Sequence, residues 1–176
     1  FVGMGKELAE NFASAREVFQ EVNDALSQDL FKIMVDGPDS ALTMTANTQP
    51  ALMAFSMAVV RVLEKDFGIK LKEKAAFVAG HSLGEYSAAC SAGVFSLSDT
   101  AKLLRIRGDA MQNAVPLGVG GMAAVLGLSY KDVGALVEAC SNDKDVCVAA
   151  NDNSDGQVVL SGSMTAIDRA VEIAAE

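Results

Sequence analysis

Apolar residues recur at helical spacing in the first part of the chain. Between Gly5 and Leu30 they fall mostly three or four residues apart, which is the spacing of one face of an amphipathic helix. Ser14–Glu17 matches a capping box, so we expect a break near Ser14 and two helices rather than one. Further along, Thr48 or Gln49 is expected to cap a helix that has Pro50 in its first turn.

That helix is apolar nearly all round from Ala51 to Leu63, so we expect it to be buried against a sheet. The apolar run Ala75–Ala79 supplies a strand for such a sheet, because it has strand length and ends at Gly80. A run of small residues follows at Ser87–Ala89 and packs closely only as a helix. We therefore expect strand, tight turn and helix in succession, as in a parallel α/β sheet.

The turn between strand and helix reads Gly80-His81-Ser82-Leu83-Gly84, which is the Gly-x-Ser-x-Gly pattern of a nucleophile elbow. A serine on such a strained turn needs glycine two residues before and two after it, because a Cβ there would collide with neighbouring backbone. The turn lifts the Ser82 hydroxyl above the sheet edge and leaves the Leu83 N–H free to face a developing oxyanion. Ser82 is thus the candidate nucleophile, with an ordinary strand-to-helix turn as the alternative.

A second candidate lies on the helix expected from Asp99 to Asn113. Arg107 shares the apolar stripe of this helix with Leu104, one turn before it, and Met111, one turn after it. A guanidinium on a packed face keeps its charge and must meet an anion. That anion is either a carboxylate of this chain, in a salt bridge, or the carboxylate of a substrate. Arg105 lies on another face, where it can be solvated.

The pattern changes beyond the glycine-rich stretch Pro116–Gly121, which we expect to be a linker. The elements predicted after it are strand, helix, two strands and helix, at Met122–Gly127, Tyr130–Ser141, Val146–Ala150, Gln157–Gly162 and Thr165–Glu176, with a polar hairpin turn at Asn151–Gly156. This order is that of a ferredoxin-like unit without its last strand. We therefore predict an α/β-hydrolase-like parallel-sheet subdomain with the elbow at 1–118, and a smaller ferredoxin-like α+β subdomain at 119–176.

Composition narrows the classes of function. The chain has 176 residues and is 51% hydrophobic, enough for one globular domain with a smaller appendage. Its net charge of −9 argues against nucleic acid and anionic membranes as partners, since both need a basic face, and no apolar run reaches membrane-spanning length. The three cysteines form no Cys/His cluster, so we expect no metal site. Their odd number and the lack of a signal peptide are typical of free thiols in the cytoplasm.

A serine hydroxyl is a poor nucleophile without a positioned base. The one histidine, His81, directly precedes Ser82, and neighbouring side chains on such a turn point in different directions. We therefore expect His81 to support the elbow rather than to take the proton. In elbow enzymes the base follows the serine in the chain, so either the chain is no catalyst or the base lies beyond Glu176. The unfinished ferredoxin-like order and the start at Phe1 favour a chain that is cut at both ends.

The segment Gly80–Ala88 resembles the active-site segment of the malonyl-CoA:acyl-carrier-protein transacylases, a family of acyltransferases in fatty acid and polyketide synthesis. Four further stretches resemble segments of the same family, namely Val2–Gly5, Thr48–Ala51, Arg107–Gln112 and Asn151–Gly162. The family's opening motif, whose glutamine resembles a second oxyanion donor, and its later histidine have no counterpart in this sequence.

The resemblance implies a ping-pong transfer. Ser82 attacks malonyl-CoA, the Leu83 N–H holds the oxyanion, Arg107 pairs with the free carboxylate, and the malonyl group passes to the phosphopantetheine thiol of acyl carrier protein. The setting would be cytoplasmic fatty acid biosynthesis, without a cofactor or metal ion in the enzyme. The alternatives are a serine esterase or thioesterase of α/β-hydrolase type, an acyltransferase module of a polyketide synthase, and a non-catalytic fragment that binds acyl carrier protein. Without a base, residues 1–176 alone are expected to have little activity.

Overall fold

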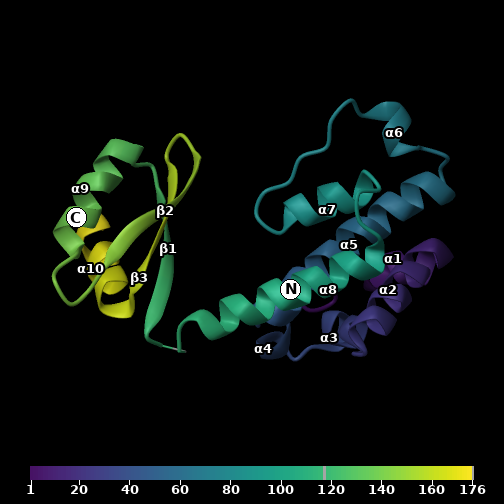
Figure 1. The fold of residues 1–176 in the computed structure, drawn as a ribbon, viewed down its shortest axis with the longest axis horizontal. Helices are drawn as coiled ribbons and strands as arrows, with labels where there is room; N and C mark the ends of the chain where they lie inside the picture. Colours follow the sequence, from purple (N-terminus) through teal and green to yellow (C-terminus); the bar gives the residue numbers. More distant parts are fainter. Residues whose placement is uncertain (117, 176) are drawn as a thin grey trace. The chain divides into compact units, whose positions relative to one another are not determined.

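The computed structural model describes residues 1–116 and 118–175. Within them the chain combines helices with a sheet and separates into two compact units, Phe1–Ala114 and Val115–Glu176 (Figure 1). The sequence predicts the boundary slightly later, at 118–119. The predicted linker includes Leu117 and the last predicted helix includes Glu176, and both residues lie outside the described part of the chain. Each unit has its own hydrophobic core.

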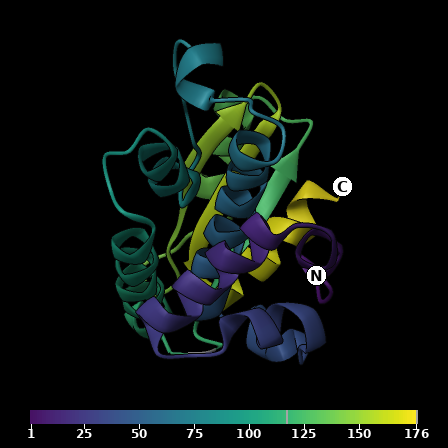
Figure 2. The ribbon, with the colours of Figure 1, turned by 90° about the vertical axis from the view of Figure 1, so that its right-hand side faces the viewer.

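In the first unit, helices pack around a long central helix, α5. The helices described here are α1 (Lys6–Asn11), α2 (Ala13–Leu26), α3 (Leu30–Asp36), α4 (Asp39–Leu42), α5 (Thr45–Lys65), α6 (Leu71–Lys74), α7 (Gly84–Ser91) and α8 (Leu97–Ala114). Both α2 and α8 pack along α5, and Figure 2 shows α2 lying across it. Phe19, Met53 and Leu104 come from these three helices and are buried in the core. The buried face of α5 thus packs against helices rather than against the predicted sheet, while Leu52 and Val59 remain exposed.

The break between the first two helices comes earlier than the capping-box pattern predicts. α2 begins at Ala13, and no side chain caps its N-terminus. The Ser14 hydroxyl instead donates a hydrogen bond to Asp66, which follows α5. The Ser14 hydroxyl, which the local pattern predicts to cap the helix, therefore forms a tertiary contact instead.

The contact between α5 and α8 positions the site described below. α5 begins at Thr45, so Pro50 lies in its second turn instead of the first. The side chain of Gln112 on α8 accepts a hydrogen bond from the Thr45 N–H at 3.2 Å. One turn earlier on α8, Gly108 lies so close to α5 that an added Cβ would be 2.7 Å from the Ala46 Cα. The two helices therefore meet backbone against backbone, which leaves little freedom in their relative placement.

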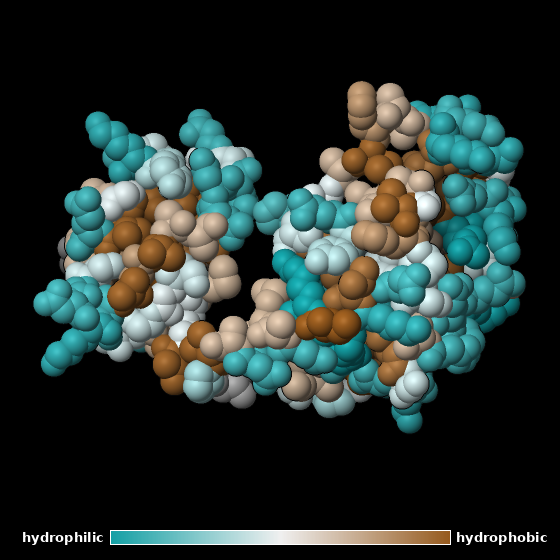
Figure 3. Space-filling view, in the orientation of Figure 1, coloured by the Kyte–Doolittle hydropathy of each residue, from teal (hydrophilic) through white to brown (hydrophobic). Residues whose placement is uncertain are grey.

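The segment Ala75–Ala79, predicted as a buried strand, forms no strand within the described residues. Phe77 is 91% exposed, and hydrophobic atoms are visible on the surface around the segment between α6 and α7 in Figure 3. The prediction of a parallel sheet is wrong for the described part of the first unit. A strand forms only beside a neighbour that takes its backbone hydrogen bonds, and residues 1–114 provide none.

The second unit is a three-stranded antiparallel sheet with two helices. Strands β1 (Gly120–Leu126), β2 (Cys147–Ser154) and β3 (Gln157–Ser163) pair in the order β1-β3-β2, with helices α9 (Tyr130–Cys140) and α10 (Met164–Ala174) packed on the sheet (Figure 1). Val125, Val158 and Leu160 of the strands form its core with Val133 and Ile167 of the helices. The predicted succession of strand, helix, two strands and helix is confirmed.

The hairpin between β2 and β3 is tighter than predicted. β2 continues to Ser154, so the turn is reduced to Asp155-Gly156, where Gly156 adopts a φ of 75°. Register shifts between Ala149 and Asn151 and again before Ser154 keep this asparagine-rich stretch in the ladder. The polar residues that predicted a loop are thus accommodated in an irregular strand.

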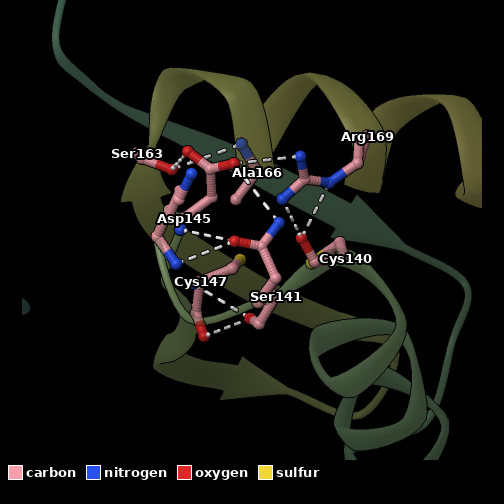
Figure 4. A network of polar contacts seen from close by, with 9 residues as sticks. Cys140, Ser141, Asp145, Cys147, Ser163, Ala166 and Arg169 are labelled. Carbon is pink, nitrogen blue, oxygen red and sulfur yellow. Dashed lines mark hydrogen bonds and ion pairs between the residues drawn. The ribbon is translucent and has the colours of Figure 1, made fainter.

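Arg169 of α10 ties the end of α9 to the segment before β2 (Figure 4). Its guanidinium donates to the Cys140 carbonyl at 2.7 and 3.0 Å and forms an ion pair with Asp145 at 3.2 Å. The hydrogen bond from Arg169 is the main reason that the pKa of Asp145 is lowered. The neighbouring Cys140 and Cys147 thiols are buried, and burial together with the Cys140 thiol raises the pKa of Cys147 to about 11.

Candidate active site

Ser82 lies in the turn that leads into α7. Its φ is 55°, a left-handed value that residues other than glycine seldom adopt, and backbone strain of this kind is typical of nucleophile turns. Two hydrogen bonds close the turn: the Gly84 N–H donates to the His81 carbonyl at 2.8 Å, and the Glu85 N–H donates to the Ser82 carbonyl at 3.2 Å. Ser82 is exposed, so its hydroxyl is accessible to a substrate.

The two glycines of the Gly-x-Ser-x-Gly pattern have different parts in this turn. A Cβ on Gly80 would lie 1.9 Å from the Gly84 carbonyl oxygen and 2.4 Å from the Glu85 nitrogen. A Cβ on Gly84 would meet nothing within 4 Å. The prediction that sterics require glycine at both positions is therefore right for Gly80 and wrong for Gly84, because the first residue of α7 faces open space.

The backbone N–H of Leu83 is free to act as an oxyanion donor. Leu83 is the N-cap residue of α7, where backbone N–H groups have no intrahelical acceptor. Across residues 1–116 and 118–175, this N–H donates to no backbone carbonyl. The helix dipole adds partial positive charge at the same end. A carbonyl oxygen held next to Ser82 would therefore find an unused donor.

Arg107 of α8 reaches the Ser82 hydroxyl. Its Nη2 lies 3.1 Å from Ser82 Oγ, its Nη1 donates to the side-chain oxygen of Gln49, and its guanidinium carbon lies 6.0 Å from the centre of the Tyr86 ring. Among the described residues the guanidinium has no carboxylate partner. The intrachain salt bridge, which was one of the two alternatives for Arg107, is therefore not formed among these residues. The half-buried guanidinium lies beside Ser82, and its contacts there are with neutral groups.

Arg105, two residues earlier on α8, is held by the protein itself. Its guanidinium donates to Asn47 Oδ1 at 3.0 Å and to the side-chain oxygen of Gln28. The prediction that Arg105 is solvated is wrong, because the side chain is half-buried and bonded to α5 and to the segment after α2. Of the two arginines, only Arg107 is directed to Ser82.

His81 is exposed, and no hydrogen bond joins its side chain to Ser82 within the described residues. The structure therefore does not bring the two side chains together, and a supporting role for His81 stays a prediction. In the same residues, the side-chain partner of the Ser82 hydroxyl is Arg107, which accepts no proton.

Sequence reasoning missed Gln49 and Tyr86. The sequence assigned Gln49 to a helix cap because Pro50 follows it, but the residue lies within α5 and is buried. The available signal was an amide shortly before the apolar stretch Ala51–Leu63, and Asn47 shares that signal. Tyr86 lies on α7, one turn after Ser82. The Gly-x-Ser-x-Gly pattern does not predict what its aromatic ring contacts.

Cys90 of α7 is a second nucleophilic group in this unit. It is buried, and desolvation raises the pKa of its thiol, so it stays protonated at neutral pH.

Within the described residues, no three His, Cys, Asp or Glu side chains are grouped so that they could hold a metal ion. None of the helices in this part of the chain is long and apolar enough to cross a membrane.

Comparisons with known proteins show what this chain is similar to. The family model described as acyl transferase domain matches residues 1–176. The malonyl CoA-acyl carrier protein transacylase of Haemophilus influenzae is 42% identical over 99% of this chain and 55% of its own length. The solved acyl-carrier-protein-S-malonyltransferase from Bartonella henselae is 56% identical, with a TM-score of 0.92 over 99% of this chain and 55% of that one.

A malonyl-transacylase solved in complex with its type II PKS acyl-carrier protein is also similar. It is 36% identical, with a TM-score of 0.89 over 99% of this chain and 55% of that one. The chain spans about half the length of the curated relatives it matches.

Proposed function

Because this chain belongs to the acyl transferase domain family, we propose that it carries the nucleophile and the carboxylate-binding residue of a malonyl transfer from malonyl-CoA to acyl carrier protein. Ser82 is the nucleophile, the Leu83 N–H is an oxyanion donor, and Arg107 binds the free carboxylate. The relatives named as malonyl transacylases support this choice of acyl group and acceptor.

The separation of 3.1 Å between Arg107 Nη2 and Ser82 Oγ carries the proposal. In a malonyl thioester, two C–C bonds of about 1.5 Å each separate the reacting carbonyl carbon from the carboxylate carbon. A guanidinium beside the nucleophile can therefore bind the carboxylate while Oγ reaches the carbonyl. An acetyl group offers no carboxylate, and the carboxylate of a longer diacid would extend beyond the guanidinium.

The first half-reaction forms an ester on Ser82. Oγ attacks the thioester carbonyl, the new O–C bond replaces the C–S bond, and the CoA thiol leaves with the proton that Ser82 gives up. Negative charge develops on the carbonyl oxygen next to the Leu83 N–H, and removal of one such donor typically costs about 2.7–4 kcal/mol of transition-state stabilisation. In the second half-reaction the phosphopantetheine thiol attacks the ester, and Ser82 regains a proton. The base for these proton transfers is expected from a residue that this chain does not contain, since no hydrogen bond joins the His81 side chain to Ser82 among the described residues.

The proposed reaction needs no cofactor in the enzyme, and the composition of the chain favours a cytoplasmic setting. Neither half-reaction changes an oxidation state, so the proposed enzyme needs no resident cofactor, and the phosphopantetheine group belongs to acyl carrier protein. The three cysteines are free thiols, which supports a reducing, cytoplasmic setting. The net charge of −9 does not favour nucleic acid or an anionic membrane as a partner.

We further assign the second unit to the ferredoxin-like folds and the nucleophile turn to the α/β-hydrolase type. The β1-β3-β2 order leaves one edge of β1 without a strand partner in the described residues. An apolar groove of about 400 Å³ lies along that strand, with Leu126, Leu128 and Val171 in its lining. A fourth strand along β1 would complete a ferredoxin-like sheet.

In the first unit, the left-handed φ of Ser82 supports the assignment of the nucleophile turn to the α/β-hydrolase type.

Mass spectrometry of the intact full-length protein after incubation with malonyl-CoA tests the proposal. We expect a malonyl ester that persists in water and is absent from Ser82→Ala. Arg107→Ala should lower the ratio of malonyl to acetyl loading about 100-fold, because hydrogen bonds to charged groups are worth about 1.5–3 kcal/mol each. Arg105→Ala is the matched control and should keep the ratio, since Arg105 is bonded to Asn47 and Gln28 instead of Ser82.

Two results would overturn the proposal in different ways. Rapid loss of the adduct to water would identify a serine esterase. An unchanged preference for malonyl groups in Arg107→Ala would remove Arg107 from its carboxylate-binding role.

A further inference from the structure

Gln49 of α5 holds the guanidinium of Arg107. The side-chain oxygen of Gln49 accepts a hydrogen bond from Nη1, and its side-chain nitrogen lies 3.2 Å from the sulfur of Met111, one turn further along α8. Gln49 is only 4% exposed. With its nitrogen engaged by Met111, the amide presents its oxygen to Arg107, so the guanidinium has a buried anchor on the side away from solvent.

Gln49 is uncharged, so its hydrogen bond does not balance the positive charge of Arg107. A carboxylate at position 49 would form a charge-assisted pair with Arg107 and balance its charge within the protein. The amide fixes the direction of the guanidinium without balancing its charge. In the part of the chain that the structure describes, the other contacts of Arg107, to the Ser82 hydroxyl and the Tyr86 ring, are neutral as well. The charge of Arg107 is therefore not balanced by these contacts and stays available to a bound anion.

We propose that Gln49 is a positioning residue that also determines specificity. It directs Arg107 towards Ser82 and, because it is uncharged, leaves the cation available for the carboxylate of the incoming acyl group. This inference rests on the proposed function, since it concerns how the same site selects acyl groups that end in a carboxylate. Gln49 acts through Arg107 and takes no part in the bond-making steps.

Gln49→Glu is the sharpest test, because the substitution keeps the size and shape of the side chain and adds a charge. In the full-length protein, kcat/KM for loading from malonyl-CoA should fall about 10- to 100-fold, the equivalent of one hydrogen bond to a charged group. Loading from acetyl-CoA should change less than about threefold, since its acyl group does not use Arg107. The loss should appear mainly in KM, because the carboxylate contact is made before and during the reaction.

Gln28→Glu is the matched control. It places the same charge beside Arg105, two residues from Arg107 on the same helix, and should leave the ratio of malonyl to acetyl loading unchanged. A merely structural role for Gln49 would lower both loading rates together. Gln49→Met keeps the volume but removes the acceptor, and it should lower the ratio by about 3- to 10-fold.

The outcomes separate this inference from the function it rests on. If Gln49→Glu keeps the wild-type ratio while Arg107→Ala loses it, the role of Gln49 is overturned and the proposed function stands. If Arg107→Ala keeps the ratio too, the carboxylate-binding role itself fails. If Gln49→Glu does not fold, Gln49→Met decides by the same ratio, and a wild-type value overturns the inference.

Discussion

Replacing Gly80 with alanine tests how the nucleophile turn is built. The new Cβ would lie 1.9 Å from the carbonyl oxygen of Gly84, 2.0 Å from its carbonyl carbon and 2.4 Å from the Glu85 nitrogen, against about 3.5–4.0 Å for relaxed contacts between carbon atoms. All three atoms are backbone at the start of α7, so no change of rotamer relieves the overlap. We expect a cost of about 3 kcal/mol, the upper end for overpacking, and a Tm lower by about 6–12 °C.

The same overlap should impair chemistry as well as stability. If the start of α7 moves, Ser82 Oγ moves relative to Arg107 and the Leu83 N–H, and a displacement of about 1 Å typically costs roughly 100-fold in rate. Calorimetry gives the Tm, and mass spectrometry after incubation with malonyl-CoA gives the rate of loading of Ser82.

Gly84→Ala is the matched control, because a Cβ there meets nothing within 4 Å. It should melt at or above the wild-type temperature, since alanine is favoured over glycine in a helix by about 0.5–1 kcal/mol, and it should still load. The reasoning is refuted if Gly80→Ala melts and loads like the wild type, or if Gly84→Ala is equally damaging.

Three further predictions concern stability and reactivity. Arg105→Met should lower the free energy of unfolding by about 1–3 kcal/mol, because it removes the hydrogen bonds from the guanidinium to the part-buried Asn47 and Gln28 side chains. It should keep the malonyl preference; urea unfolding measures the first effect, and a loss of preference would contradict the second. Arg169→Met should be less stable than the wild type at neutral pH. Because the folded pKa of Asp145 is lowered from 3.8, its stabilising contribution is present above that value and is lost as the pH falls through the folded pKa. The difference in unfolding free energy should therefore narrow in acid, and a difference independent of pH would argue against the ion pair. The thiol of Cys147, with a pKa of about 11, should react with iodoacetamide far more slowly in the folded protein than in urea, and equal rates would show an accessible thiol.

Local patterns predict much of this fold, and tertiary contacts account for the differences. The second unit follows from short apolar runs and polar turns, which are properties of neighbouring residues. The start of α2 could not be predicted in the same way, because the Ser14 hydroxyl bonds to Asp66, far along the chain. Likewise, α5 begins early at Thr45, where a side chain of α8 accepts its N–H. The segment Ala75–Ala79 has the composition of a strand, but composition does not supply a neighbouring strand.

The sequence predicts the main residues of the candidate site but not the contacts between them. Ser82 and the free N–H of Leu83 follow from a five-residue pattern, and Arg107 stands out because it is a charge on an apolar stripe. The contact between Arg107 and Ser82 depends on how α8 packs, and so do the roles of Gln49 and Tyr86. The helical periodicity of α8 separates Arg107, on the apolar stripe, from Arg105 on another face. It does not reveal that Arg105 is bound by Gln28 and Asn47.

The absence of an acidic neighbour around Arg107 in the described residues bears on inhibitor design. A serine-reactive compound with an acid group one methylene away from its electrophilic carbon would gain charge-assisted hydrogen bonds to this guanidinium. Neutral reagents that label serine hydrolases broadly would gain nothing from it. Such an acid group would therefore direct a covalent compound towards Ser82 and away from serine enzymes whose pockets lack a free cation.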